Sequence, residues 1–192
     1  MNISKFTQKS IEAVQNMEKI AATHGNQQIE QIHLLASLLD IDGSLIVNLI
    51  KKMGINENEF RNEVESALEK LPKVSGGKTY ISNDLNKVLI TAEDVAKSMG
   101  DEYVSVEHIF LNILENPSSD VAQIFRIYGI DKNKFLQVLS EVRGNQKVVS
   151  DNPEATYDTL NKYGYDLVER ARAQKLDPVI GRDSEIRNVI RI

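Results

Sequence analysis

The tetrapeptide Gly76-Gly77-Lys78-Thr79 is the stretch closest to a nucleotide-binding motif, because Gly-Lys-Thr ends a phosphate-binding loop. Such a loop also needs a glycine five positions before its last one, and Pro72 stands there. It must follow a buried strand, whereas the residues up to Leu71 follow a helical pattern. We therefore interpret residues 71–80 as a turn and expect no phosphate to bind there.

Three histidines, His24, His33 and His108, are the candidates for metal binding or acid–base chemistry. None has a second histidine or a carboxylate at ligand spacing on the same predicted helix face. Cysteine is absent, and Ser44 and Ser119 are better explained as helix-start residues than as nucleophiles. The sequence therefore predicts no metal site and no catalysis within residues 1–143.

Residues 6–67 and 81–142 are two copies of one pattern, aligned without a gap at an offset of 75 positions. Ten of the 62 aligned pairs are identical, where ordinary composition would give about four. Apolar positions stay apolar when they change, as in Val14/Leu89 and Ile20/Val95. His33 and His108 are an identical pair, which favours the same packing or helix-start role in each copy. We predict an all-α fold of two tandem four-helix repeats related by a pseudo-twofold axis.

The first helix of each copy has an N-cap candidate, Thr7 or Ser82, and ends at a glycine, Gly25 or Gly100. In the second copy, Ser105 can cap the next helix. The predicted helices lie between residues 7 and 25, 32 and 39, 44 and 53, and from 56 onward in the first copy, and between 82 and 100, 106 and 114, 120 and 128, and from 131 onward in the second.

The sequence changes character after Arg143. Residues 144–153 are polar without sustained periodicity, which predicts a flexible linker. Residues 154–192 carry helical patterns again, and the last pattern has not ended at Ile192. We expect a helical domain over 1–143, a linker over 144–153 and, over 154–192, the truncated start of another module.

The composition, 41% hydrophobic and 27% charged, is that of ordinary globular proteins. The net charge is −5 and no lysine–arginine stripe is present, so nucleic acid is not an expected partner. Residues 1–15 lack a secretory apolar core, and Asp40 and Asp42 interrupt the most apolar stretch, residues 34–50. We expect a cytoplasmic protein without a membrane span.

Several motifs resemble the duplicated N-terminal domain of the Clp ATPases. They are residues 5–9 (KFTQK), 32–39 (IHLLASLL), 104–111 (VSVEHIFL) and 71–77 (LPKVSGG). Residues 152–167 and 175–186 resemble the entry into the first ATPase module of the disaggregase branch of this family. The resemblance covers essentially the whole chain, which has no Walker A loop, Walker B carboxylates or coiled-coil middle domain.

The resemblance implies the substrate-engaging domain of an ATP-dependent chaperone that disaggregates and unfolds proteins by threading. Its partners would be unfolded or aggregated clients, bound through apolar segments in a groove between the repeats. The full-length protein would be a homohexameric AAA+ ATPase that uses ATP and magnesium and works with the DnaK chaperone system. This chain alone would be a monomer without cofactor or enzymatic activity. An adaptor-docking domain of a protease-linked Clp unfoldase is the nearest alternative, and an ATPase or metal enzyme is a third.

The resemblance also implies which residues contact clients and nucleotide. Client contact falls on Thr7, Asp101 and Glu107, and an adjoining groove on Leu89, Thr91 and Val95. Most have a structural alternative: a helix cap for Thr7, a turn for Asp101, the helix dipole for Glu107, and the core for Leu89 and Val95. Val179 and Ile180 would lie against the adenine of ATP, at a site that is incomplete without the Walker A loop.

Overall fold

The computed structural model describes residues 3–74, 78–144 and 146–153, and the single positions 172, 181, 182, 187 and 188. The chain divides into two compact units, Met1–Tyr157 and Asp158–Ile192. The helices and strands named below belong to the first unit. The predicted adenine contacts, Val179 and Ile180, lie outside the described residues, as does most of the predicted module over 154–192.

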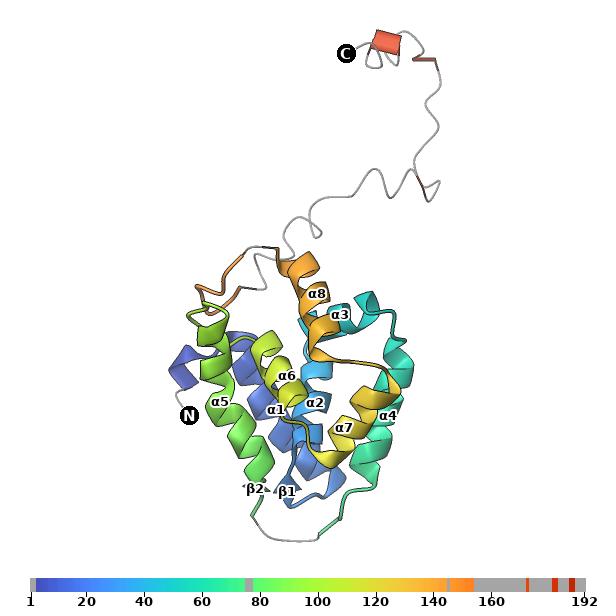
Figure 1. Ribbon diagram of the computed structural model, residues 1–192. Helices are drawn as coiled ribbons and strands as arrows, with labels where there is room; N and C mark the ends of the chain where they lie inside the picture. Colours follow the sequence, from blue (N-terminus) through green and yellow to red (C-terminus); the bar gives the residue numbers. More distant parts are fainter. Residues whose placement is uncertain are drawn as a thin grey trace. The chain divides into compact units, whose positions relative to one another are not determined.

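The first unit is built mainly from α-helices (Figure 1). Each copy of the sequence pattern forms four of them, so the predicted all-α fold of two four-helix repeats is confirmed, with ends shifted by a few residues. After a short 3-10 helix, η1 (Ile3–Lys5), the first repeat has α1 (Gln8–His24), α2 (Gln31–Asp40), α3 (Leu45–Lys52) and α4 (Glu57–Glu69). The second has α5 (Asn83–Ser98), α6 (Val106–Glu115), α7 (Ser119–Ile127) and α8 (Lys132–Arg143).

Two short parallel contacts join the repeats. Strand β1 (Gln28–Ile29) pairs with β2 (Tyr80–Ile81), with Ile29 opposite Ile81, and an isolated bridge joins Phe6 to Val104. Val104 lies 75 positions after Ile29, and Phe6 lies 75 positions before Ile81. One contact is therefore the other with the repeats exchanged, which is what a pseudo-twofold axis requires. Strands of two residues are too short to show the alternation by which a sequence reveals a strand.

The predicted helix ends are present in both repeats. The hydroxyl of Thr7 accepts a hydrogen bond from an amide of the first turn of α1 at 3.3 Å, and the hydroxyl of Ser82 does the same for α5 at 3.2 Å. Gly25 and Gly100, which follow the two helices, have φ of 71° and 74°. A residue with a Cβ rarely adopts this left-handed backbone, so glycine is favoured at both positions.

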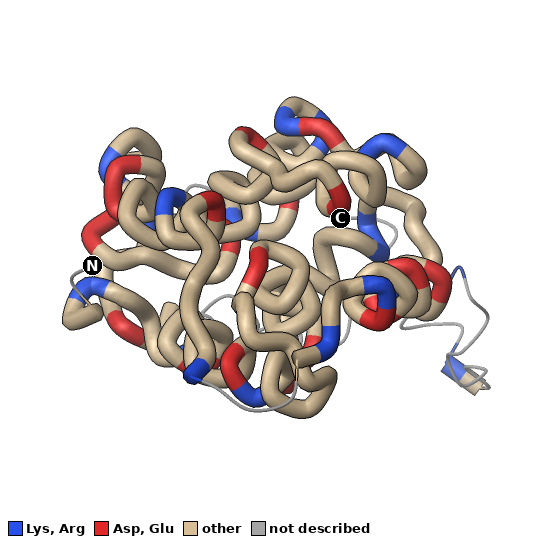
Figure 2. Tube along the Cα trace, turned by 90° about the horizontal axis from the view of Figure 1, so that it is seen from below, with Lys and Arg blue, Asp and Glu red and all other residues tan. Residues whose placement is uncertain are grey.

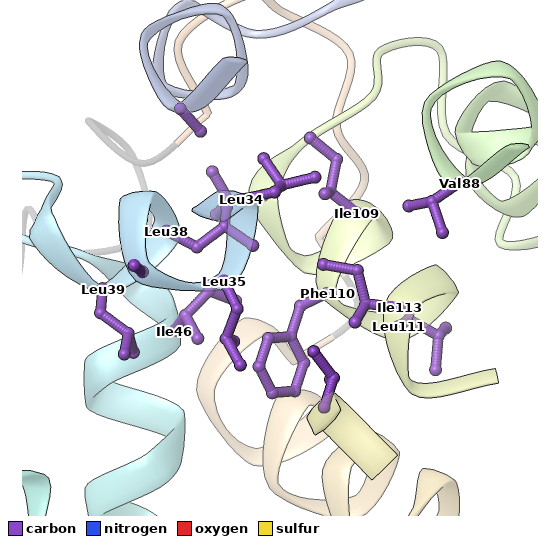
Figure 3. Packing of buried hydrophobic residues seen from close by; sticks show 14 of the residues in the cluster. Leu34, Leu35, Leu38, Leu39, Ile46, Val88, Ile109, Phe110, Leu111 and Ile113 are labelled. Atoms are coloured by element: carbon purple, nitrogen blue, oxygen red, sulfur yellow. The ribbon is translucent and has the colours of Figure 1, made fainter. Parts of the chain in front are cut away.

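The core lies between the repeats, where α2 and α6 are buried along almost their whole length. Figure 3 shows Leu34 and Leu35 of α2 beside Ile109 and Phe110 of α6. Among the helices of the described residues, none alone is long and apolar enough to span a membrane; α2 and α3 pass that test only together, across a 90° bend. Acidic and basic residues are interspersed along the trace rather than gathered by sign (Figure 2).

Residues 146–153, which we call the exit segment, fall within the predicted linker over 144–153 and contact the rest of the first unit. Val148 is fully buried, and its carbonyl accepts a hydrogen bond from the backbone N–H of Glu102 at 3.0 Å. The backbone N–H of Gln8 donates to the carbonyl of Asp151 at 2.8 Å. The exit segment therefore lies against the loop after α5 and the start of α1 (Figure 1). A pattern of local polarity does not predict this, because the partners are distant in sequence.

Candidate functional site

Four ionisable side chains lie together inside the second repeat, and we call them the Asp101 cluster: Asp101, Glu107, His108 and Arg143. Each is at most 7% exposed. Asp101 follows α5, Glu107 and His108 lie in the first turns of α6, and Arg143 ends α8. Charged side chains are seldom buried unless they are paired, so the hydrogen bonds among these four decide what the cluster can do.

The carboxylate of Asp101 is the centre of the cluster. Its Oδ2 accepts a hydrogen bond from Nε2 of His108 at 2.8 Å. Its Oδ1 accepts one from the backbone N–H of Val148 at 2.9 Å and another from Nη2 of Arg143. Burial alone would oppose ionisation, but these donors hold the pKa of Asp101 well below its usual range. Asp101 is therefore a carboxylate at neutral pH and is bonded to the exit segment.

His108 connects Asp101 to the start of α6. Its Nδ1 accepts the backbone N–H of Ser105, the N-cap residue, at 2.9 Å. Since a backbone N–H can only donate, we assign the ring proton to Nε2, which faces Asp101. His33 makes the matching bond to the N-cap of α2, from Glu30, also at 2.9 Å. Both histidines thus have the helix-start role that the repeat alignment predicted.

Glu107 is fully buried in the first turn of α6. Its Oε2 accepts a hydrogen bond from the hydroxyl of Ser105. Its Oε1 lies 3.8 Å from Nη1 of Arg143 and has no hydrogen-bond partner among the residues that the structure describes. Arg143 in turn donates from Nε to the carbonyl of Gln146 at 2.5 Å. The cluster therefore holds two carboxyl groups beside one guanidinium. Oε1 of Glu107 can still accept a hydrogen bond from a further donor.

A pocket of about 600 Å³ opens beside the Asp101 cluster, where η1 meets the end of α5. Glu93 lies 3.5 Å from Lys5 and 3.1 Å from Lys97, and hydrogen bonds from these lysines, chiefly Lys97, lower the pKa of Glu93. The lining is thus largely charged, unlike the apolar groove expected between the repeats. The lining residues are Ser4, Lys5, Glu93, Ala96, Lys97, Asp101, Glu102 and Tyr103.

The structure brings together only some of the predicted client contacts. Asp101 and Glu107 share the cluster, and Asp101 also lines the pocket. Thr7 is fully buried as the N-cap of α1, and its backbone N–H donates to the carbonyl of Val104 at 2.9 Å. Leu89 belongs to the core.

Thr91 and Val95, the other two predicted groove residues, are half-buried on α5. The hydroxyl of Thr91 accepts a hydrogen bond from Nδ2 of Asn112 at 2.8 Å, and Val95 packs partly against the core. Both side chains thus have structural partners while remaining accessible. Contact of any of the six residues with clients stays a prediction.

Sequence reasoning missed the roles of Arg143 and Val148 in the cluster. A signal for this cluster was present in the repeat alignment, where Glu107 stands opposite Ile32; at the same offset, one position beyond the aligned copies, Arg143 corresponds to Leu68. A charge in one copy at a position that is apolar in the other marks a site special to that copy. Among the described residues, no three His, Asp or Glu side chains are placed to hold a metal ion.

The chain belongs to the family of Clp repeat (R) N-terminal domains, whose pattern matches residues 5–128. Over its whole length it is similar to the N-terminal region of the chaperone protein ClpB. It is 47% identical to ClpB of Nitratidesulfovibrio vulgaris over 198 residues, which cover 100% of this chain and 23% of that protein. The chain thus spans less than a quarter of this relative, and the resemblance seen in the motifs is confirmed.

Two solved structures extend the comparison. The Hsp104 N-terminal domain of Candida albicans matches with a TM-score of 0.68 and 25% identity, over 77% of this chain and 97% of that one. The ClpV N-domain in complex with a VipB peptide matches with a TM-score of 0.59 and 19% identity, over 72% of this chain and 89% of that one. At the lower identity the likeness shows the fold alone.

Proposed function

We propose that this chain is the client-engaging N-terminal module of a ClpB-like chaperone that disaggregates and unfolds proteins by threading. The observation that carries the proposal is the similarity to ClpB over the entire chain, including the residues beyond the Clp repeat match. ATP and magnesium, a homohexameric ring and cooperation with the DnaK system belong to the full-length protein in this proposal. The peptide complex of ClpV supports it, because a domain of this fold holds a peptide there.

We place client contact on the outer side of α5. Three residues of α5 form what we call the α5 surface: Ile90, which is 54% exposed, and the half-buried Thr91 and Val95. Tyr80 and Ile81, immediately before α5, are also exposed. Exposed apolar side chains attract unfolded segments, which expose apolar side chains of their own. The charged side chains of Glu93 and Lys97 on the same helix disfavour nonspecific association.

The fully buried residues act differently in this arrangement. Thr7 and Glu107 have no exposed surface and support the start of α1 and the start of α6.

Weak binding is sufficient for such a module, because a tether to the rest of the protein raises the effective concentration of bound clients near the ring.

An NMR titration of the isotope-labelled chain with unfolded casein tests the proposal. We expect shifts at Ile90, Thr91 and Val95. Replacing Val95→Lys should weaken binding about fivefold or more, since a charge replaces an apolar contact. Ile20→Lys is the matched control, because Ile20 occupies the aligned, partly buried position on α1 and should leave binding unchanged.

The outcomes separate the alternatives. Equal weakening by Val95→Lys and Ile20→Lys would place the client site away from the α5 surface. No shift at any casein concentration would refute client engagement by this chain. Binding of a folded adaptor protein without binding of casein would favour the adaptor-docking role instead.

A further inference from the structure

The exit segment is bound through its backbone at Val148, where the N–H of Val149 also donates to the carbonyl of Lys147 at 3.1 Å and closes a tight turn. The N–H of Val148 donates to Oδ1 of Asp101 at 2.9 Å. The carbonyl of Val148 accepts from the N–H groups of Glu102 and Tyr103 at 3.0 and 3.3 Å. Both polar backbone groups of Val148 are therefore satisfied by the loop after α5. Backbone bonds of this kind do not depend on the side chain of the bound residue.

The other end of the exit segment is bound at the start of α1. The backbone N–H of Gln8 donates to the carbonyl of Asp151 at 2.8 Å, and Nε2 of Gln8 donates to Oδ2 of Asp151 at 3.1 Å. The first N–H groups of a helix have no partner within the helix and are free to bind another segment. Gln8 follows Thr7 directly. The exit segment thus joins Asp101, one of the predicted client contacts, to Gln8, the residue after Thr7.

The side chains of the exit segment divide into buried and exposed ones. Val148 is fully buried, while Val149, the next residue, is 60% exposed. Lys147 lies over Gly100, where an added Cβ would stand 2.9 Å from its Nζ. Burial of one small branched side chain at one of the two backbone-bonded positions gives the site a selectivity that backbone bonds alone do not provide.

In the first repeat, the corresponding connection is held at both ends by packed elements. There the connection after α4 lies in the corresponding place, with the N–H of Val74 bonded to the carbonyl of Gly25 at 2.8 Å. That connection leads into β2 and α5, which are packed in the unit, so it cannot leave without breaking the repeat. The exit segment leads into no helix or strand among the described residues of the first unit.

We propose that the loop after α5 and the start of α1, where the exit segment lies, form a second client contact besides the α5 surface, and that an unfolded client segment displaces the exit segment from it. The client then takes over the bonds of Val148 and Asp151. This inference rests on the proposed function and specifies the partner: an unfolded segment with a small branched apolar residue that can turn sharply, followed three positions later by a carboxylate. Displacement also makes Asp101 accessible to the client.

The test uses the whole chain and two neighbouring substitutions. Val148→Asp places a charge at the buried position and next to Asp101, so it should release the exit segment. Val149→Asp is the matched control at the exposed neighbour. With casein in fluorescence anisotropy, Val148→Asp should bind on the order of tenfold more tightly, because the competing occupant no longer holds the site. Val149→Asp should bind as the unsubstituted chain does. Hydrogen exchange at the amides of Gln8 and Glu102 should accelerate only in Val148→Asp.

A second variant controls for the possibility that Val148→Asp alters casein binding by disturbing the fold. Val148→Ala removes buried methyl groups without adding charge, and should tighten casein binding in the same direction, about threefold. Unchanged or weaker casein binding by both Val148 variants would overturn the inference, while binding by the unsubstituted chain would leave the proposed function standing. Absence of casein binding by every one of these chains would overturn both.

Discussion

His33 and His108 cap matching helices of the two repeats, but their outer ring nitrogens meet different partners. Nε2 of His33 lies 3.1 Å from Oδ1 of Asn26, and Nε2 of His108 lies 2.8 Å from Oδ2 of Asp101. Asn26 and Asp101 are themselves aligned, 75 positions apart. The same hydrogen bond is therefore made to a neutral amide in one repeat and to a carboxylate in the other.

This difference changes how each repeat holds the segment that follows it. An amide can donate, and Nδ2 of Asn26 donates to the carbonyl of Pro72 at 3.1 Å. Proline has no N–H, so its carbonyl is the only backbone group it can offer. A carboxylate can only accept, and Asp101 accepts the N–H of Val148. The second repeat thus binds a segment that offers an N–H, which any residue except proline can do.

The residues around these two hydrogen bonds also differ, apolar in the first repeat and charged in the second. Leu68 and Ile32 occupy the first repeat where Arg143 and Glu107 occupy the second, and all four are buried. The fold therefore accepts either an apolar or an ionic centre. Buried ions seldom improve stability over apolar residues of similar size, so the ionic centre is better explained by what it binds than by what it stabilises.

The largest effect on stability should come from removing the charge of Arg143 alone from the Asp101 cluster. Arg143→Leu introduces the residue of the first repeat but leaves Asp101 and Glu107 without their guanidinium. We expect a loss of about 3–5 kcal/mol in the free energy of unfolding, measured by urea denaturation. The triple variant that adds Asp101→Asn and Glu107→Ile, again the residues of the first repeat, should recover most of this loss.

The triple variant decides whether the comparison is sound. Its recovery would show that the two centres are alternative solutions for one fold. A triple variant as unstable as Arg143→Leu would mean that the second repeat depends on its ions for stability. A loss below about 1 kcal/mol for Arg143→Leu alone would contradict the pairing seen in the structure.

A smaller effect concerns acid stability, which should differ between the centres. Burial of the ring lowers the pKa of His33 from 6.5 to about 4, so the folded chain resists its protonation. The unfolded chain binds this proton more readily, so His33 contributes stability above pH 6.5 that is lost as the pH falls towards 4. The loss is on the order of 3 kcal/mol. Asp101, whose pKa is lowered, loses its contribution only below its ordinary pKa, near 3.8.

Unfolding free energies measured between pH 7.5 and 4.5 test whether the contribution of His33 is lost at a higher pH than that of Asp101. In His33→Gln, glutamine keeps an acceptor for the N-cap amide of Glu30 but does not titrate, so the decline over this range should largely disappear. His24→Gln is the control. Hydrogen bonds to Glu65 and to the carbonyl of Ile20 raise the pKa of His24, so its contribution is lost as the pH rises, in the opposite direction. An unchanged decline in His33→Gln would exclude His33 as the cause.

The sequence predicted those features that depend on residues close together. Caps such as Thr7 and Ser82 and the glycine that ends each first helix follow from local rules, and the repeat reveals the four-helix unit. The Asp101 cluster depends on Arg143 and Val148, more than 40 positions away from Asp101. Helical periodicity indicates which face is buried but not which polar groups meet inside. Such pairings had a partial signal in the repeat, because a charged residue stands opposite Ile32 and, one position beyond the aligned copies, another corresponds to Leu68.

The smallest effect is expected from replacing Gly25 or Gly100, the glycines that follow α1 and α5, with alanine. Both have positive φ, so alanine at either position should lower the free energy of unfolding by roughly 1 kcal/mol through backbone strain. An alanine Cβ at position 25 meets its nearest atom, the Cβ of Lys73, at an ordinary 3.9 Å. At position 100 it lies 2.9 Å from Nζ of Lys147, at the flexible end of a side chain that can move aside at little cost.

The two glycine variants should therefore have similar melting temperatures but differ in how firmly the exit segment is bound. Gly100→Ala displaces Lys147, which neighbours the docked Val148, so exchange at the Glu102 amide should accelerate in that variant and remain unchanged in Gly25→Ala. A loss for Gly100→Ala more than about 1 kcal/mol greater than for Gly25→Ala would mean that Lys147 is held firmly in place. The exit segment would then be as fixed as the connection after α4, and the second repeat would lose the feature that distinguishes it as an exchangeable site.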